Sequence, residues 1–338
     1  MFKLAMFNLV KPLKLAALAL AVGCSTVSGA AHADDKVTLF LGFTPEPETG
    51  GFMQAFATGL YKKAGLDVEI KFGNPQAAPG ASMAAGKIDF SASPGSIALN
   101  AVREGVPRVV VAAIFQKEVR ILMAHKGAGN DTLEQMKGKP ILVAATGRGT
   151  FWPFLAAKYG FTDDQLRPYT GSQAPFLNSK NAIEQGYITS EPFLVRTAGA
   201  DPVYVALADH GYEGYASTIL TSNKLIETNP AMVQRFVDAT IEGWYDFLYG
   251  NPAPAIKYLQ SANPDITDER VAYAIKVIKD NGIVDSGDAK KLGIGAMTDE
   301  RWARIIKQQQ DFKILPTDVD FRKAYTLQFV NKQVGMKK

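Results

Sequence analysis

Short apolar runs alternate with stretches of helical pattern from residue 37 to about residue 220. Residues 37–41 (VTLFL) predict a strand, residues 51–63 predict a helix, and residues 68–70 predict a second strand. Alternation of this kind is typical of α/β folds, in which helices cover mainly parallel sheets. The chain therefore begins its folded part with a β-α-β unit.

The same unit recurs further along the chain. Residues 141–145 (ILVAA) predict a strand, and residues 150–158 predict a helix that ends at Gly160. A second internal similarity relates residues 86–94 (GKIDFSASP) to residues 186–192 (GYITSEP), because each segment has a glycine, a predicted short strand and a polar turn with a proline. Two copies of one pattern predict two similar lobes.

Two segments are expected to join these lobes as hinges. Residues 116–120 connect the apolar runs 109–114 and 121–124, and residues 215–218 lead into a further strand-like run. The predicted organisation is a signal segment followed by two lobes, of which the first is built from two separate stretches. The boundaries are 1–33 for the signal segment, 34–119 and 217–338 for lobe I, and 120–216 for lobe II.

The pattern becomes helical from Asn229 onward. Asn229 is followed by a proline at the expected first helical position, and apolar residues then recur at helical spacing. Residues 267–269 and 298–300 (both TDE) each predict a helix start, since the acids favour the positive end of the helix dipole. We expect this helical extension to pack on lobe I.

The amino terminus has the pattern of an export signal. Lysines precede an apolar run over residues 13–22, and Ala31-His32-Ala33 offers small residues at the positions that a signal peptidase recognises. Cleavage after Ala33 would shorten the chain from 338 to 305 residues and lower its formal net charge from +4 to +1. The alternative is a lipid anchor on Cys24, which small residues also precede. A periplasmic location is predicted in either case.

Composition excludes several classes of function. A nearly neutral mature chain without a basic tract argues against nucleic acid. Only two histidines, His125 and His210, would remain after cleavage, and the chain has no paired cysteines and no Gly-x-Ser-x-Gly motif. This inventory argues against metal sites and hydrolytic catalysis, so no catalytic residue, metal or cofactor is expected. Residues 147–152 (GRGTFW) match the first two glycines of a dinucleotide fingerprint, but Trp152 replaces the third. We therefore expect a binding protein and no enzyme.

Loops at the carboxyl ends of parallel strands are where ligands bind in open α/β sheets. Several predicted loops combine hydroxyls, backbone donors at helix starts, one carboxylate and aromatic rings, which suits a pocket that stacks a flat ring. Each aromatic residue also fits a core position, and Glu191 also fits a helix cap. The candidate ligand-binding residues are Phe43, Thr44, Pro45, Ser93, Pro94, Gly95, Ser96, Arg148, Gly149, Thr150, Phe151, Trp152, Ser190 and Glu191, with Phe115 and Gln116 at the hinge.

Four segments carry a resemblance to a known family: residues 41–45 (LGFTP), 61–69 (YKKAGLDVE), 86–90 (GKIDF) and 187–193 (YITSEPF). They resemble the periplasmic binding proteins that serve thiamine-pyrimidine, sulfonate, taurine and nitrate importers. The resemblance covers nearly the whole mature chain. It implies a two-lobed clamshell of the type II class that closes on one small ligand and docks, as a monomer, on an ABC permease with its cytoplasmic ATPase.

The ligand itself stays open at this point. One hypothesis is a flat heteroaromatic solute such as a pyrimidine vitamin precursor, with Phe43 and Trp152 stacking on it and Glu191 accepting a ring N–H. The alternative is an alkanesulfonate or taurine held by Arg148 and the hydroxyls of Ser93 and Thr150. A hypothesis of another class is an enzyme on the same fold that processes a vitamin precursor. The chain lacks the histidine or lysine cluster expected of nitrate-type loops.

Overall fold

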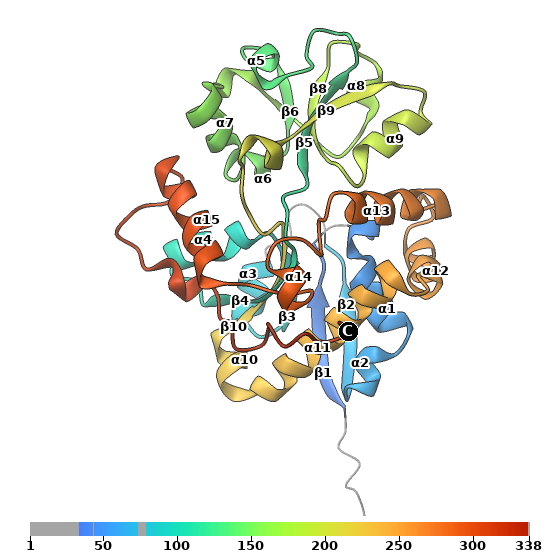
Figure 1. Cartoon of the computed structure of the whole chain (residues 1–338), viewed down its shortest axis with the longest axis vertical. Helices are drawn as coiled ribbons and strands as arrows, with labels where there is room; N and C mark the ends of the chain where they lie inside the picture. The colour runs from blue at the N-terminus through green and yellow to red at the C-terminus, as the bar shows by residue number, and fades with distance from the viewer. Residues whose placement is uncertain (1–33, 43, 74–78, 337–338) are drawn as a thin grey trace, which may run out of the picture. The chain divides into compact units, whose positions relative to one another are not determined.

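The strands of the protein form two five-stranded sheets, which Figure 1 shows as two lobes. The computed structural model describes residues 34–42, 44–73 and 79–336. Lobe I is defined here as the first sheet with its helices, and lobe II as the second sheet with its helices. The two-lobed α/β fold predicted from the sequence is confirmed.

The sheet of lobe I has the order β2-β1-β3-β10-β4. Its strands are β1 (Asp35–Phe40), β2 (Leu66–Lys71), β3 (Phe90–Ser93), β4 (Arg108–Phe115) and β10 (Ser217–Ser222). β1 pairs in parallel with β2 and β3, whereas β10 pairs antiparallel with β3 and β4. One strand, β10, therefore runs against the other four, and it lies between β3 and the edge strand β4.

The sheet of lobe II repeats this arrangement in the order β7-β6-β8-β5-β9. Its strands are β5 (Arg120–His125), β6 (Ile141–Val143), β7 (Leu166–Pro168), β8 (Ile183–Tyr187) and β9 (Pro202–Ala206). β6 is parallel to β7 and β8, and β5 is antiparallel to β8 and β9. The reversed strand of each sheet, β5 or β10, is the first strand after the chain crosses between lobes, which explains why it runs the other way.

Helices surround both sheets (Figure 1). Lobe I carries η1 (Pro47–Thr49), α1 (Gly50–Ala57), α2 (Leu60–Lys63), α3 (Pro79–Ala84), α4 (Gly95–Arg103), α10 (Asn223–Thr228), α11 (Pro230–Tyr249), α12 (Ala253–Ala262), α13 (Asp268–Asp280), α14 (Ala289–Leu292), α15 (Asp299–Asp311) and η4 (Phe321–Ala324). Lobe II carries α5 (Leu133–Met136), α6 (Ala145–Arg148), α7 (Trp152–Tyr159), η2 (Asp163–Gln165), α8 (Ala174–Leu177), α9 (Glu191–Thr197) and η3 (Leu207–His210). Among the described residues, no helix has both the length and the apolar character that crossing a membrane requires.

The helical extension packs on lobe I, as its pattern predicts. Asn229, Thr267 and Thr298 each cap a helix, because their side chains accept a backbone N–H two or three residues into it. α11 lies against α1 at a place where only glycine fits. A Cβ added to Gly51 would lie 2.2 Å from the Trp244 ring, and one added to Gly50 would lie 2.1 Å from the Phe247 ring.

Two local predictions differ from the structure. The single helix expected over residues 51–63 is two helices, because Gly59 adopts a left-handed conformation with φ of 74° and separates α1 from α2. The strand expected after Gly186 lies around it instead, since β8 ends at Tyr187 and the polar turn follows at once. The second copy of the sequence pattern is therefore shifted relative to the first.

The chain crosses between the sheets after Phe115 and again before Ser217, close to the predicted hinges. Gln116 fixes the first crossing, since its Nε2 donates to the carbonyls of Ala113 (2.8 Å) and Ala296 (2.9 Å). Arg301 holds both crossings together, because it donates to the carbonyl of Gln116 and its guanidinium lies 4.7 Å from the centroid of the Tyr215 ring. The boundaries at 119/120 and 216/217 stay predictions.

Candidate ligand-binding site

Glu191 is the carboxylate among the predicted ligand-binding residues. It begins α9 directly after the turn that follows β8, and its side chain is only 8% exposed. The Tyr187 backbone N–H donates to its Oε2 (2.7 Å), and the Tyr169 hydroxyl donates to its Oε1 (3.1 Å). These two donors fix the carboxylate and leave each oxygen a further lone pair for a ligand.

Lobe I brings two more glutamates and an arginine to the same place. Glu46 and Glu48 lie at the start of η1, and Arg270 lies in the first turn of α13. Arg270 forms an ion pair with Glu46 and donates to the Ser190 hydroxyl (3.4 Å), which belongs to lobe II. The Thr189 hydroxyl donates to Glu48. We call these residues, Glu46, Glu48, Thr189, Ser190, Glu191 and Arg270, the junction cluster.

A second contact joins the lobes beside the junction cluster. The Tyr273 hydroxyl, from α13, donates to the carbonyl of Ile188 (3.0 Å) in lobe II. The Tyr273 ring also lies 5.4 Å from the ring of Phe193, centroid to centroid. The turn between β8 and α9 is therefore held by lobe I through side chains of η1 and α13.

Carboxyl groups outnumber cationic groups in and around the junction cluster. Burial, followed by the charge of Glu48, raises the pKa of Glu46 to about 8 although Arg270 opposes this. Burial also raises the pKa of Glu191 to about 7, against the stabilising hydrogen bond from Tyr187. Glu184, on β8, has its pKa raised to about 8 by burial and then by the charge of Glu191. These carboxyls hold protons more tightly than free glutamate does.

Several buried polar atoms here have no hydrogen-bond partner among the described residues. The acceptors are Glu48 Oε2, Gln173 Oε1 and both carboxylate oxygens of Glu184, whereas Arg270 Nε is the corresponding donor. Buried polar atoms of native proteins are nearly always hydrogen-bonded. The chemistry that complements this set is therefore rich in N–H or O–H donors.

The first predicted loop only partly reaches this site. Phe43 lies outside the described residues, Thr44 is exposed, and Pro45 is buried with its carbonyl accepting from Asn263 (3.1 Å). Glu46 and Glu48, which follow directly, are the residues of this segment that contact lobe II or its neighbours. The candidate residues of this loop were Phe43, Thr44 and Pro45 without Glu46 or Glu48, and a ligand-binding role of the loop stays a prediction.

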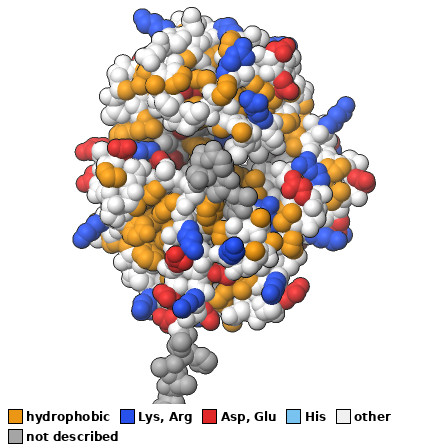
Figure 2. Space-filling model, turned by 180° about the vertical axis from the view of Figure 1, so that it is seen from behind, with side chains coloured by type: hydrophobic (Ala, Val, Ile, Leu, Met, Phe, Trp, Pro, Cys, Tyr) orange, Lys and Arg blue, Asp and Glu red, His pale blue; other side chains and the backbone are white. Residues whose placement is uncertain are grey.

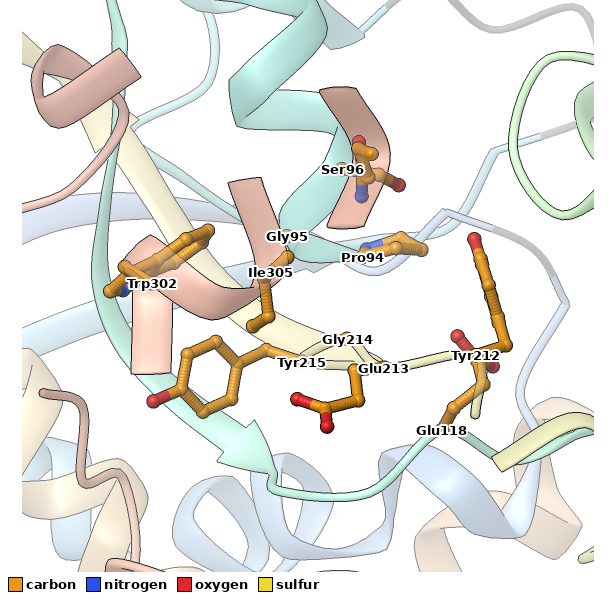
Figure 3. Close-up of a pocket in the computed structure, with 11 residues that line it drawn as sticks. Pro94, Gly95, Ser96, Glu118, Tyr212, Glu213, Gly214, Tyr215, Trp302 and Ile305 are labelled. Carbon is orange, nitrogen blue, oxygen red and sulfur yellow. The ribbon is translucent and has the colours of Figure 1, made fainter. Parts of the chain in front are cut away.

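The loop after β3 lies at the other crossing. Pro94, Gly95 and Ser96 line a small cavity of about 10 Å³ together with Glu118, Tyr212 and other residues of the crossings, as Figure 3 shows. A volume of this size holds about one water molecule, so it cannot hold an organic solute. Ser93 lies just before this loop, and its carbonyl accepts from the Thr218 hydroxyl (2.7 Å).

The turn after β6 differs most from its predicted role. Arg148 and Gly149 are exposed at the end of α6, a short helix that the pattern did not predict. Phe151 is completely buried, and Trp152 is 2% exposed with its ring 5.7 Å from that of Phe161. The structure thus gives the Trp152 ring no face for stacking on a ligand, because lobe II packs around it. Thr150 is buried and donates to the Thr146 carbonyl (3.0 Å).

Phe115 and Gln116 belong to the hinge. The Phe115 ring meets the Trp244 ring edge-on at 5.5 Å, and Gln116 makes the backbone contacts described above. Neither contacts the junction cluster. The structure therefore brings Ser190 and Glu191 together with residues that the loops alone did not predict, namely Glu46, Glu48, Tyr169, Glu184 and Arg270.

The described residues contain no group of three or more His, Cys, Asp or Glu able to hold a metal ion. Charged side chains are scattered over the face that Figure 2 shows, without a continuous basic patch. The junction cluster is thus one charged group found where the lobes meet, and the buried ion pair of Glu118 and Arg120 is another.

The chain is similar to a known protein family and to proteins of known name. A family model described as "NMT1/THI5 like" matches residues 46–255. Riboflavin-binding protein RibY of Chloroflexus aurantiacus is 24% identical over 303 residues, which cover 87% of this chain and 86% of the relative. The matched region contains the candidate residues from Ser93 to Glu191, whereas Phe43, Thr44 and Pro45 precede it.

Solved structures share the fold at low sequence identity. The periplasmic aliphatic sulphonate binding protein SsuA of Escherichia coli superposes with a TM-score of 0.64 at 14% identity, covering 86% of this chain and 91% of SsuA. The desulfurization enzyme DSZB superposes with a TM-score of 0.57 at 15% identity, covering 87% and 97%. At such identities these neighbours support the fold alone.

Proposed function

The chain belongs to the NMT1/THI5-like family, and on that premise we propose that it is the periplasmic solute-binding component of an ABC importer. In this proposal it is a monomer that captures a flat heteroaromatic solute bearing N–H donors, and it delivers the solute to a membrane permease with its ATPase. The protein performs no chemistry on the solute. Ligand capture takes place where the junction cluster joins the two lobes.

The observation that carries this proposal is the excess of acceptors and negative charge around Glu191. Arg270 is already paired with Glu46, so an anionic ligand would meet the uncompensated carboxyls of Glu48 and Glu191. A ring N–H or an exocyclic amine instead supplies the donors that these oxygens lack. Tyr169, Tyr187 and Tyr273 are partly buried beside the cluster and offer aromatic surface to a flat ring.

Riboflavin is the first compound to test. The relative RibY is named for binding riboflavin, and the flavin ring is flat, heteroaromatic and bears both an N–H and a hydroxylated side chain. A pyrimidine vitamin precursor is the second, since it shares the flat ring and the N–H donors. Both compounds fit an acceptor-rich site better than a sulfonate does.

The proposal is tested by titrating the purified protein with riboflavin and with pyrimidines, following flavin fluorescence and heat. Glu191→Gln keeps the shape of the side chain and removes its charge, so we expect affinity to fall about 10-fold to 100-fold, since hydrogen bonds to charged groups contribute about 1.5–3 kcal/mol. Glu227→Gln, on the exposed surface of α10, is the matched control and should bind like the wild type. Absence of binding to every ring compound would reject the proposal.

An alkanesulfonate is the second candidate, because SsuA shares the fold and Arg148 is exposed beside Thr150. The two candidates respond differently to salt. Binding of a sulfonate by an exposed arginine should weaken markedly between 0.05 M and 0.5 M salt, whereas binding of a neutral ring should hardly change. Strong salt dependence together with loss of binding in Arg148→Gln would indicate that the ligand binds at α6.

The fold also accommodates an enzyme, as DSZB demonstrates. We propose a binding role because the sequence has no Gly-x-Ser-x-Gly motif and no paired cysteines, and the described residues contain no group able to hold a metal ion. Recovery of the bound compound unchanged after long incubation is the expected result. Conversion of riboflavin or a pyrimidine at a rate proportional to protein concentration would favour the enzyme.

A further inference from the structure

Glu184 is a buried carboxyl whose role the proposed function does not explain. It lies on β8 between β5 and β6, opposite Met123 and Leu142, and is completely buried. Neither of its carboxylate oxygens has a partner among the described residues. A buried acid without hydrogen bonds is costly, so such a residue calls for an explanation.

The geometry of β8 places Glu184 on the same face as Glu191. Residues two apart on a strand share a face, so Glu184 and Gly186 point the same way. A Cβ added to Gly186 would lie 3.0 Å from Cβ and 3.2 Å from Cδ of Glu191. The Glu191 side chain therefore lies directly on Gly186, and glycine at this position leaves room for the carboxyl beside Glu184.

Two further residues complete the surroundings. The Tyr169 hydroxyl donates to Glu191, and Gln173 Nε2 donates to the Tyr169 oxygen (2.9 Å). Gln173 Oε1 is buried and, like the Glu184 oxygens, lacks a partner among the described residues. Every unpartnered atom in this group is an acceptor.

No described lysine or arginine forms an ion pair with Glu184, so an ionised Glu184 would have no counter-charge among the described residues. The other titratable groups on this face come from β5 and β9. His125 stacks on the Phe176 ring at 4.1 Å and contacts the Phe176 carbonyl, and Tyr204 lies across from Met123. Neither makes a hydrogen bond to Glu184.

We propose that Glu184, Gln173 and Glu191 form a subsite that takes an amino or ammonium nitrogen of the ligand. The inference rests on the proposed function and deepens it, since it names the group that the ligand presents to lobe II. An amino nitrogen donates two or three hydrogen bonds and satisfies acceptors on several sides. A carbonyl oxygen in its place would leave the buried Gln173 Oε1 without a donor.

Proton release provides a signature of this subsite. With its pKa near 8, Glu184 carries a proton at pH 7 before ligand binds. Accepting a hydrogen bond from an ammonium group favours the ionised form, so the proton leaves when the ligand enters. Affinity for an amine that stays protonated should therefore rise as pH increases from 6 to 8.

The test compares two pyrimidines that differ in one group, 4-(aminomethyl)pyrimidine, whose side chain is largely an ammonium ion at pH 7, and 4-(hydroxymethyl)pyrimidine, by calorimetry at pH 7 in two buffers of different ionisation enthalpy. Wild-type protein should bind the aminomethyl compound at least 10-fold more tightly and release protons on binding. Glu184→Gln should lose both the preference and the proton release, while Glu227→Gln keeps both. The melting temperature of Glu184→Gln should be no lower than that of the wild type, which separates a lost subsite from a misfolded protein.

The outcomes separate this inference from the proposed function. If Glu184→Gln keeps the preference and the proton release, the subsite is refuted and the proposed function stands. Binding of riboflavin with equal affinities for the two pyrimidines also refutes the subsite alone. If wild-type protein binds none of the three compounds, the proposed function fails.

Discussion

The stability of the unliganded protein should depend on pH through Glu184 in an unusual direction. Burial raises the pKa of Glu184 from 4.5 to about 8. A carboxyl with a raised pKa stabilises the folded state below its unfolded pKa, and this contribution is lost as pH rises through the folded pKa. Between pH 5 and pH 7 the folded protein keeps a proton that the unfolded chain gives up. The free energy of unfolding therefore falls with increasing pH.

The size of the effect follows from the two pKa values. For one group that titrates at 4.5 in the unfolded chain and near 8 in the folded protein, linkage predicts a loss of about 2–3 kcal/mol between pH 5 and pH 7. Glu184→Gln removes the titrating group while keeping its volume. The variant should thus lose about 2–3 kcal/mol less than the wild type over this interval.

Urea unfolding of wild type, Glu184→Gln and Glu227→Gln at pH 5, 6, 7 and 8 measures this difference. The slope against pH is the informative quantity, because an unpaired glutamine amide adds a cost that does not vary with pH. Glu227 is exposed and serves as the control, with a curve parallel to the wild type. Parallel curves for wild type and Glu184→Gln would refute the argument that burial holds a proton on Glu184.

The remaining predictions concern packing and the contacts between lobes. Arg270→Met should destabilise the protein by about 2 kcal/mol in urea unfolding, since it leaves the partly buried Glu46 without its partner; a change below 0.5 kcal/mol would contradict this. Trp152→Phe should lower the free energy of unfolding by about 1–2 kcal/mol, because it loses the hydrogen bond to Asp163, and should leave riboflavin affinity unchanged. A tenfold loss of affinity would instead indicate that Trp152 contacts the ligand. Gly51→Ala should destabilise by about 3 kcal/mol, because its Cβ would overlap the Trp244 ring, and an unchanged melting temperature would count against such close packing of α1 and α11. Tyr273→Phe removes a hydrogen bond between the lobes worth about 1 kcal/mol, so ligand affinity should fall about fivefold in the same titration, and equal affinity would show that this contact does not favour the bound form.

The sequence pattern predicted the architecture because the architecture depends on local signals. Strands β1, β4 and β6 contain short apolar runs, β2 alternates apolar and charged residues, and the caps at Asn229, Thr267 and Thr298 are visible as single residues before helical patterns. The repeat of the β-α-β unit then implied two lobes. What the pattern could not show is the reversal of β5 and β10, because strand direction depends on where the chain re-enters a sheet.

The site was harder to predict because it depends on contacts between distant segments. Glu191 was identified from its place after a strand, and it does lie at the junction. Arg270 gives no such signal, since it occupies an ordinary helical position and meets Glu46 only through the packing of η1 on α13. Trp152 was assigned to the site because its place in a glycine-rich turn resembles a binding loop. The structure instead buries its ring in the core of lobe II.

Glu184 was overlooked because the sequence around it carries little signal. The segment 183–187 (IEQGY) contains two polar side chains and a glycine, so its pattern does not predict a buried strand. The displaced interpretation of this strand, which began it after Gly186, also put Glu184 outside the element. A shift of a few residues in a strand thus removed the most informative carboxyl from consideration.

The position of β10 has a consequence for how the chain acquires its structure. β10 lies between β3 and β4, so the sheet of lobe I stays split in two until residue 222 has been synthesised. Lobe II, by contrast, is one uninterrupted stretch whose five strands are complete by Ala206. The lobe that starts first along the chain is therefore the one that finishes last. Until then the facing edges of β3 and β4 expose unpaired backbone groups, which makes this interval the time at which the nascent protein is most open to aggregation.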